Sequence, residues 1–163
     1  MVRNDDKNVV MEGVRLIFRN FSGKEGQYNR EGDRNFAVLL DPKTAKEMEK
    51  DGWNVKVLNP REEGDEPQPY LTVAVNYKGR PPRVVLITSH SRTNLTEDTV
   101  GTLDWADIIN ADLIVRPYEW AVSGKTGVKA YLQSLYVTIQ EDPLEAKYAD
   151  VNPAADLDNL PFR

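Results

Sequence analysis

The chain has 163 residues, of which 40% are hydrophobic, and a formal net charge of −5 at pH 7. This length suits one domain, with or without tails. It has no cysteine and a single histidine, His90, which excludes a disulfide framework and a zinc site of the usual thiolate and imidazole ligands. No apolar run reaches the roughly 18 residues of a membrane span, and no signal peptide is recognisable. We therefore expect a cytoplasmic protein without a membrane partner.

The negative charge is concentrated in two segments. Residues 141–163 carry six acidic and two basic side chains, and residues 61–66 carry four acidic and one basic. The rest of the chain holds 18 basic and 16 acidic residues, a net charge of +2. This mildly basic body is compatible with a polyanionic partner. Residues 141–163 show no periodicity, so we predict a domain at 1–140 and a disordered acidic tail at 141–163.

Residues 9–21 alternate in the manner of a long first strand. One face would carry Val10, Val14, Leu16 and Phe18, and the other Arg15, Ile17, Arg19 and Phe21. Gly13 within this run predicts a bulge or a sharp bend. Long bent strands of this kind close small barrels.

The segment 22–34 reads SGKEGQYNREGDR, with three glycines, three basic residues and Tyr28. It predicts a flexible loop between two antiparallel strands. Such a loop could fold over a polyanion as a basic finger. An ordinary solvated hairpin loop is the alternative, because surface loops are usually polar.

Further elements follow in order. Residues 35–40 form a strand, and a helix capped by Asp41 starts at Pro42 and ends before Gly52. Another extended segment begins at Trp53. Residues 70–77 are a strand, and residues 84–88 are its expected antiparallel partner.

A long β-hairpin at residues 113–139 is the strongest prediction. Its arms are rich in β-branched and aromatic residues, and SGKTG at 123–127 supplies the turn. Alternation puts Arg116, Tyr118 and Trp120 in a row on one face. A cation beside two rings would suit stacked bases and phosphates, whereas the alternative is that both rings cover the core. Together the elements indicate a mainly β fold, a five-stranded Greek-key barrel with a short helix insertion. A sandwich remains the alternative.

Catalytic patterns are fragmentary. SGKTG lacks the first glycine of a phosphate-binding loop, since Glu119 occupies that position. Ser89 and His90 lie near acidic residues but without a nucleophile elbow. The acids Asp104, Asp107 and Asp112 have no regular metal-site spacing. We expect no enzyme activity, no metal and no cofactor.

The last residues, AADLDNLPFR, carry a specific motif. They resemble the acidic tip of bacterial single-stranded DNA-binding proteins, in which aspartates precede a closing Ile-Pro-Phe. The resemblance implies that this tip recruits replication or recombination enzymes through Asp156, Asp158, Leu160, Pro161 and Phe162. The departure is Arg163, which follows the phenylalanine and adds a positive charge.

The body resembles the single-stranded DNA-binding proteins of tailed bacteriophages. The likeness rests on the first strand with its basic glycine-rich loop and on the closing hairpin with its Arg116–Trp120 row and GVKAYL. It implies an OB-like barrel without catalytic activity, in which rings stack on bases and basic side chains follow the phosphates. It also implies sequence-independent protection of single strands during phage DNA replication, recombination or repair in the host cytoplasm, with self-association into a homo-oligomer left open.

The expected DNA-binding residues combine the basic loops with the aromatic row. They are Arg15, Arg19, Phe21, Lys24, Tyr28, Arg30, Arg34, Tyr77, Arg80, Arg83, Arg92, Arg116, Tyr118, Trp120 and Lys125. Two other functions compete with this one: a non-catalytic structural or interaction module of a phage particle, and a small nuclease or hydrolase. Binding to oligo(dT) separates the first hypothesis from both.

Overall fold

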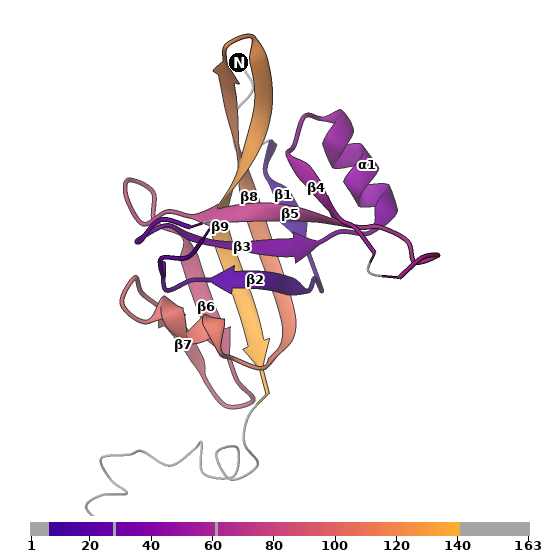
Figure 1. Cartoon of the computed structure of the whole chain (residues 1–163). Helices are drawn as coiled ribbons and strands as arrows, with labels where there is room; N and C mark the ends of the chain where they lie inside the picture. The colour runs from indigo at the N-terminus through magenta and orange to yellow at the C-terminus, as the bar shows by residue number, and fades with distance from the viewer. Residues whose placement is uncertain (1–6, 28, 61, 141–163) are drawn as a thin grey trace, which may run out of the picture.

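The computed structural model describes residues 7–27, 29–60 and 62–140. Nine strands and one α-helix make up this part of the chain (Figure 1). In chain order the elements are β1 Val9–Met11, β2 Leu16–Asn20, β3 Arg34–Leu39, α1 Pro42–Lys50, β4 Val55–Leu58, β5 Gln68–Val75, β6 Arg83–Ile87, β7 Arg92–Leu95, β8 Ile108–Val122 and β9 Lys125–Ile139. A short 3-10 helix, Val100–Asp104, precedes β8. The predicted tail lies outside the described residues.

The strand order confirms the OB-like barrel. Hydrogen-bonded neighbours run β1-β8-β9-β5-β3-β2, and β5 pairs with β9 in parallel while the other pairs of this path are antiparallel. Its two ends, β1 and β2, are consecutive pieces of one segment. The chain between Met11 and Leu16 therefore joins the two edge strands of the sheet and completes the barrel, although β1 and β2 do not pair with each other. Gly13, at φ +62°, lies at this corner, in the left-handed region that glycine tolerates best.

Additional elements decorate the five barrel strands. Strand β4 pairs with β5, and the β6–β7 hairpin pairs through β6 with the C-terminal half of β9. The expected pairing of residues 84–88 with 70–77 is wrong, because β6 pairs in parallel with β9 and antiparallel with β7. Alternation cannot choose between candidate partners, since several strands of this chain have the same apolar period.

The helix α1 confirms its predicted boundaries. The Asp41 carboxylate accepts a hydrogen bond from Thr44 N at 2.8 Å and caps the first turn, and Pro42 occupies the first helical position. Gly52, at φ +95°, follows the last turn. Ala45 and Met48 form the buried side of the helix. In the described part of the chain no helix is long and apolar enough to cross a membrane.

A bulge in β2 exchanges the roles of two phenylalanines. Ile17 pairs with Ala37 and Asn20 with Asn35, so two residues of β2, Phe18 and Arg19, oppose one residue of β3. The bulge reverses the side to which the following residues point. Phe21 is fully buried and stacks on Phe36 with ring centroids 4.9 Å apart, whereas Phe18 is 59% exposed. The predicted alternation over residues 9–21 is therefore wrong at two places. Met11 is buried and Val10 is 62% exposed, whereas Leu16 is buried after the Gly13 corner, so the pattern shifts between β1 and β2 and shifts again at the bulge.

Candidate nucleic-acid interface

The β8–β9 hairpin projects beyond the barrel (Figure 1). Each arm has 15 residues, and Val122 pairs with Lys125 across a two-residue turn. Both turn residues have positive φ, 51° at Ser123 and 81° at Gly124. This is the turn geometry whose twist matches that of antiparallel strands. The predicted hairpin is thus confirmed and extends five residues further toward the N-terminus.

The predicted row on β8 is present. Leu113 and Val115 point into the core with almost no exposure, so the alternate residues Arg116, Tyr118 and Trp120 lie on the opposite face. Tyr118 is 56% exposed. The row therefore belongs to the outer surface of the hairpin, and its rings do not fill the barrel.

Strand β9 adds a second row to this face. Arg116 pairs with Tyr131, and Tyr118 pairs with Lys129. The Tyr118 and Tyr131 rings meet edge to face at 5.7 Å, and the Lys129 Nζ lies 5.2 Å from the Tyr131 centroid. The Arg116 guanidinium lies 5.9 Å from the same ring. Aromatic rings and cations thus alternate across both strands, which is the combination that binds unpaired bases and phosphates.

Trp120 lies across Gly127. A Cβ atom at Gly127 would come within 2.5 Å of the Trp120 Cζ2 atom, so only glycine lets the indole lie flat on β9. Trp120 pairs with Gly127 in the register and remains partly exposed. The sequence GVKAYL therefore has a specific role at its first residue, which is to make room for the ring.

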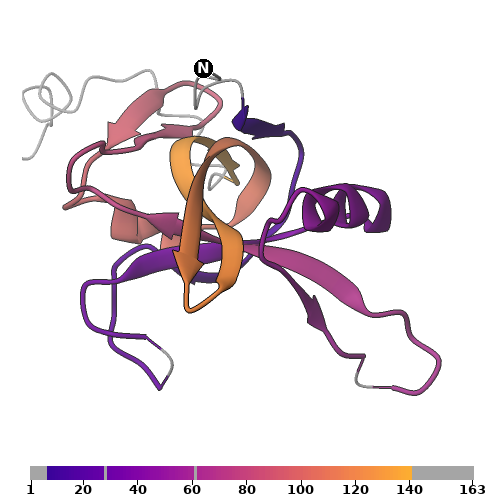
Figure 2. The same ribbon diagram turned by 90° about the horizontal axis from the view of Figure 1, so that it is seen from above.

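A groove of about 520 Å³ lies at the base of the hairpin. Seen from above, the hairpin lies between the loop after β2 and the loop joining β4 to β5 (Figure 2). The groove floor comes from β3 and β5, and its walls come from β4, the β5–β6 loop and the hairpin. Among its lining residues are Asn35, Asn54, Lys56, Thr72, Ala74, Asn76, Lys78, Trp120, Lys129 and Tyr131.

The groove is positively charged. Lys56, Lys78 and Lys129 line it from three different segments, together with Arg34, and Asp33 is the one acidic residue among its described lining residues. The overall charge of −5 conceals this local excess. Lysines on three sides of a polar floor, beside two rings, can hold a phosphate backbone and stack its bases.

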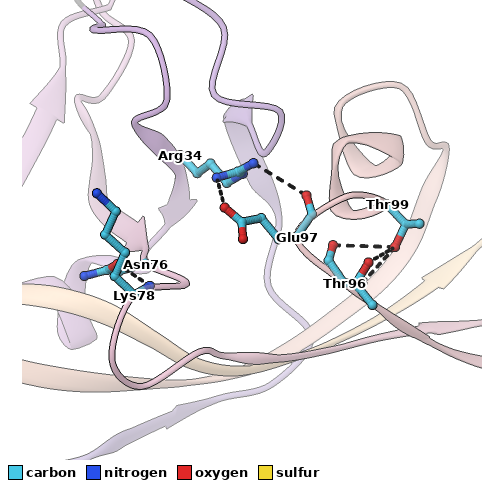
Figure 3. Close-up of polar contacts among 6 residues, drawn as sticks. All are labelled: Arg34, Asn76, Lys78, Thr96, Glu97 and Thr99. Carbon is cyan, nitrogen blue, oxygen red and sulfur yellow. Dashed lines mark hydrogen bonds and ion pairs between the residues drawn. The ribbon is translucent and has the colours of Figure 1, made fainter.

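Arg34 lines the groove but is engaged in an ion pair, and Tyr77 lies outside the groove lining. Arg34 pairs with Val75, a buried residue of the core side, and its Nη1 lies 3.3 Å from a Glu97 carboxylate oxygen (Figure 3). Its guanidinium lies 5.5 Å from the Tyr77 ring centroid. Arg34 therefore fastens the loop after β7 to the barrel, and the Tyr77 ring lies beside its guanidinium.

Two other predicted residues have structural roles. The Arg19 Nη1 donates to the carbonyl oxygens of Leu103 and Ala106, both at 2.8 Å. Phe21 is a core residue whose ring has no exposed face for a base. Both are thus removed from the set of DNA contacts that we propose.

The remaining predicted residues that the structure describes do not appear in the groove lining. The Lys24 Nζ is 4.8 Å from the centroid of Trp105, and the Arg92 guanidinium is 5.7 Å from that of Tyr136. Tyr28 lies outside the described residues, as do the tip residues Asp156, Asp158, Leu160, Pro161 and Phe162. Among the predicted DNA-binding residues, five further cations are exposed but do not line the groove: Arg15, Arg30, Arg80, Arg83 and Lys125. Their contact with DNA stays a prediction.

Several groove residues were missed by sequence reasoning. Lys56 and Lys78 lie in segments without a strong pattern, and Lys129 and Tyr131 were recognised as hairpin residues without being assigned a role. For the last two a signal existed. Alternation from Gly127 places Lys129 and Tyr131 on one face of β9, and a two-residue turn brings that face beside Trp120.

The acidic residues near β8 fasten the first segment of the chain. Asp104 accepts hydrogen bonds from Phe21 N at 2.6 Å and Ser22 Oγ at 2.6 Å, and Asp112 accepts one from Gly13 N at 2.7 Å. Within the described ranges no three His, Cys, Asp or Glu side chains come together as a possible metal site.

Comparison with known proteins identifies the family. The profile of the family described as "Putative phage ssDNA-binding domain" matches residues 1–161. The single-stranded DNA-binding protein of bacteriophage Enc34, solved in complex with ssDNA, is similar in structure, with a TM-score of 0.56 at 13% identity over 88% of this chain and 94% of that one. Another structure of the Enc34 protein has a TM-score of 0.54 at 13% identity and covers 96% of each chain. No curated protein is similar enough in sequence to count as a match. The chain belongs to the phage single-stranded DNA-binding domain family.

Proposed function

We propose that this protein binds single-stranded DNA without regard to sequence and protects it during phage DNA replication, recombination or repair in the host cytoplasm. The observation that carries the proposal is the groove with Lys56, Lys78 and Lys129 around it and with Trp120 and Tyr131 on its wall. Rings stack on any base, and lysines attract any phosphate, so this arrangement favours single strands without selecting a sequence. Family membership supports the same function. Nothing in the proposal requires catalysis.

Titration with oligo(dT), followed by tryptophan fluorescence, tests this function. We expect saturable binding that weakens as salt rises, because each phosphate contact contributes about 0.7 to the negative slope of log affinity against log salt. Excess duplex DNA should compete poorly, since its bases are already stacked. Flat salt dependence, or equal binding of duplex, would contradict the proposal.

Two charge-matched double variants locate the binding site. Lys56→Gln with Lys129→Gln removes two positive charges from the groove, and Arg83→Gln with Arg92→Gln removes two from outside its lining. The groove variant should lower the salt slope by about 1.4 and weaken binding, whereas the variant outside the lining should change both quantities less. The opposite ranking would place the DNA on the β6–β7 side.

The proposal also includes recruitment of a replication or recombination enzyme by the tip. Asp156 and Asp158 would meet a basic rim, and Phe162 would enter an apolar pocket. Phe162→Ala should abolish capture of such an enzyme from infected-cell extract and leave oligo(dT) affinity unchanged. Identical partners recovered with both proteins would contradict this part alone.

A further inference from the structure

Phe18 is an exposed ring on a strained backbone. Its φ is +50°, a left-handed conformation that is an outlier for a bulky residue, and its side chain is 59% exposed. The bulge between Ile17 and Asn20 turns it out of the core side of β2. Bulges that redirect a side chain, and strained residues generally, concentrate at functional sites. An exposed ring gains little burial to offset the strain, so packing alone does not explain this arrangement.

Phe18 lies against a second ring on the outer face of the sheet. Its ring meets that of Tyr70 edge to face, with centroids 5.7 Å apart. Tyr70 is on β5, two residues before Thr72, and the groove lining includes Thr72 and Ala74. Alternate residues of a strand share one face and are separated by about 7 Å. The Phe18–Tyr70 pair therefore continues the outer face that forms the groove floor.

Positive charges flank this pair in the strand register. Tyr70 pairs with Leu39 on one side and with Lys56 on the other. The backbone oxygen of Arg15 accepts a hydrogen bond from Leu39 N at 3.1 Å, so Arg15, Leu39, Tyr70 and Lys56 form one row across the sheet. Arg15 and Lys56 are both exposed, and Lys56 also lines the groove. The row thus repeats the combination of ring and cation found at the hairpin.

We propose that Phe18 and Tyr70 form a second base-stacking site, which binds the single strand where it leaves the groove toward β2. Lys56 is adjacent to both sites, because it pairs with Tyr70 and lines the groove, and it holds the phosphate that joins them. The inference rests on the proposed function, because it concerns the same ligand and extends its path. A short strand confined to the groove would not reach Phe18, whereas a longer strand would occupy both sites.

The test compares Phe18→Gly with wild type on two oligo(dT) lengths, one of about four nucleotides and one of about 12, within the range that OB folds cover. Glycine removes the ring and also relieves the positive φ, so the melting temperature should stay constant or rise. Phe18→Tyr keeps a ring and serves as the rescue. Val57→Ala is the matched control, because Val57 is 52% exposed and its neighbour Lys56 points to the opposite face of β4. Trp120→Ala reports on the groove.

We expect Phe18→Gly to weaken binding of the longer strand about ten-fold and to leave the shorter one within about two-fold. Phe18→Tyr and Val57→Ala should behave like wild type, and Trp120→Ala should weaken both lengths. If Phe18→Gly binds the longer strand like wild type while Trp120→Ala weakens both, the second site does not exist but the proposed function stands. A lower melting temperature with equal losses on both lengths would make Phe18 a structural residue and overturn the inference. Failure of wild type to bind either strand would overturn the proposed function and this site with it.

Discussion

The hairpin and strand β2 both present an aromatic ring on the outer face of the barrel, but by different backbone devices. At the hairpin, Trp120 continues the regular alternation of β8 and lies over Gly127, a residue with no side chain to obstruct it. At β2, a bulge and a positive φ turn Phe18 outward, and Phe21 takes the core position beside Phe36. The first device requires a small residue on the neighbouring strand, and the second requires local strain.

This difference predicts different responses to mutation. A ring placed by regular pairing depends on its cross-strand neighbour, so a substitution at Gly127 should change the position of the Trp120 ring. A ring placed by a bulge depends on its own backbone, which costs roughly 1–2 kcal/mol per left-handed residue. The neighbouring Phe21 is then fixed in the core. Substitutions at Phe21, Trp120, Gly127 and Tyr77 test this difference.

Phe21→Ala should lower the free energy of unfolding by about 3–5 kcal/mol, the range for removing a large buried ring. The reason is that Phe21 has no exposed surface and stacks on Phe36 at 4.9 Å. Urea denaturation measures the change. If the variant were as stable as wild type and bound DNA more weakly, Phe21 would belong to the outer face, and the contrast between the two strands would disappear.

Trp120→Ala should weaken binding to oligo(dT) by about 1–3 kcal/mol, the contribution of one base–aromatic stack. The free energy of unfolding should fall less in Trp120→Ala than in Phe21→Ala, because Trp120 is partly exposed. Fluorescence anisotropy with labelled oligo(dT) and thermal melting decide between the two roles. A lost melting transition with unchanged affinity would assign this ring to the fold.

Gly127→Ala should weaken oligo(dT) binding by about 1 kcal/mol, at the lower end of the stacking range, because the new Cβ displaces the Trp120 ring. A shift of the tryptophan emission spectrum should accompany the loss. Thr126→Ala is the control, since Thr126 is an exposed neighbour on the same strand. Equal behaviour of the two variants would show that Trp120 does not depend on Gly127.

Tyr77→Phe should change the free energy of unfolding by no more than about 1 kcal/mol at neutral pH, because the buried Tyr77 hydroxyl has no hydrogen-bond partner among the described residues. Burial raises the pKa of this phenol above its ordinary value of 10.0, the Arg34 charge opposes the shift, and Glu97 adds to it. Folding thus favours the protonated form. The stabilisation of the fold by protonated Tyr77 is fully present below the pKa that Tyr77 has in the unfolded chain. It is lost as the pH rises through the higher pKa that Tyr77 has in the folded protein.

Denaturation curves recorded at increasing alkaline pH measure this change in the free energy of unfolding. The Phe variant should lose less stability than wild type as the pH rises above about 10, and its affinity for DNA should be unchanged, because Tyr77 does not line the groove. A marked loss of affinity in Tyr77→Phe would return this residue to the binding site.

Elements with local sequence signals could be predicted without the structure. The cap at Asp41, the proline at Pro42 and the glycine at Gly52 delimit α1 without reference to any other part of the chain. The hairpin turn and the row from Arg116 to Trp120 follow from alternation, because the pairing is regular from Val115 to Val122. Family membership was also foreseeable, from the first strand with its basic loop, the closing hairpin and the C-terminal tip.

Which rings and charges share a surface depends on the packing of remote segments and could not be predicted from the sequence. The bulge in β2 leaves no distinct sequence signal, and it moved Phe21 into the core and Phe18 out of it. Arg19 and Arg34 looked available for phosphates, but carbonyl oxygens and Glu97 engage them. Lys56 and Lys129 are distant in the sequence and meet at one groove because β5 pairs with both β4 and β9. Register and strand order arise from contacts between remote segments, and alternation within one segment carries no information about them.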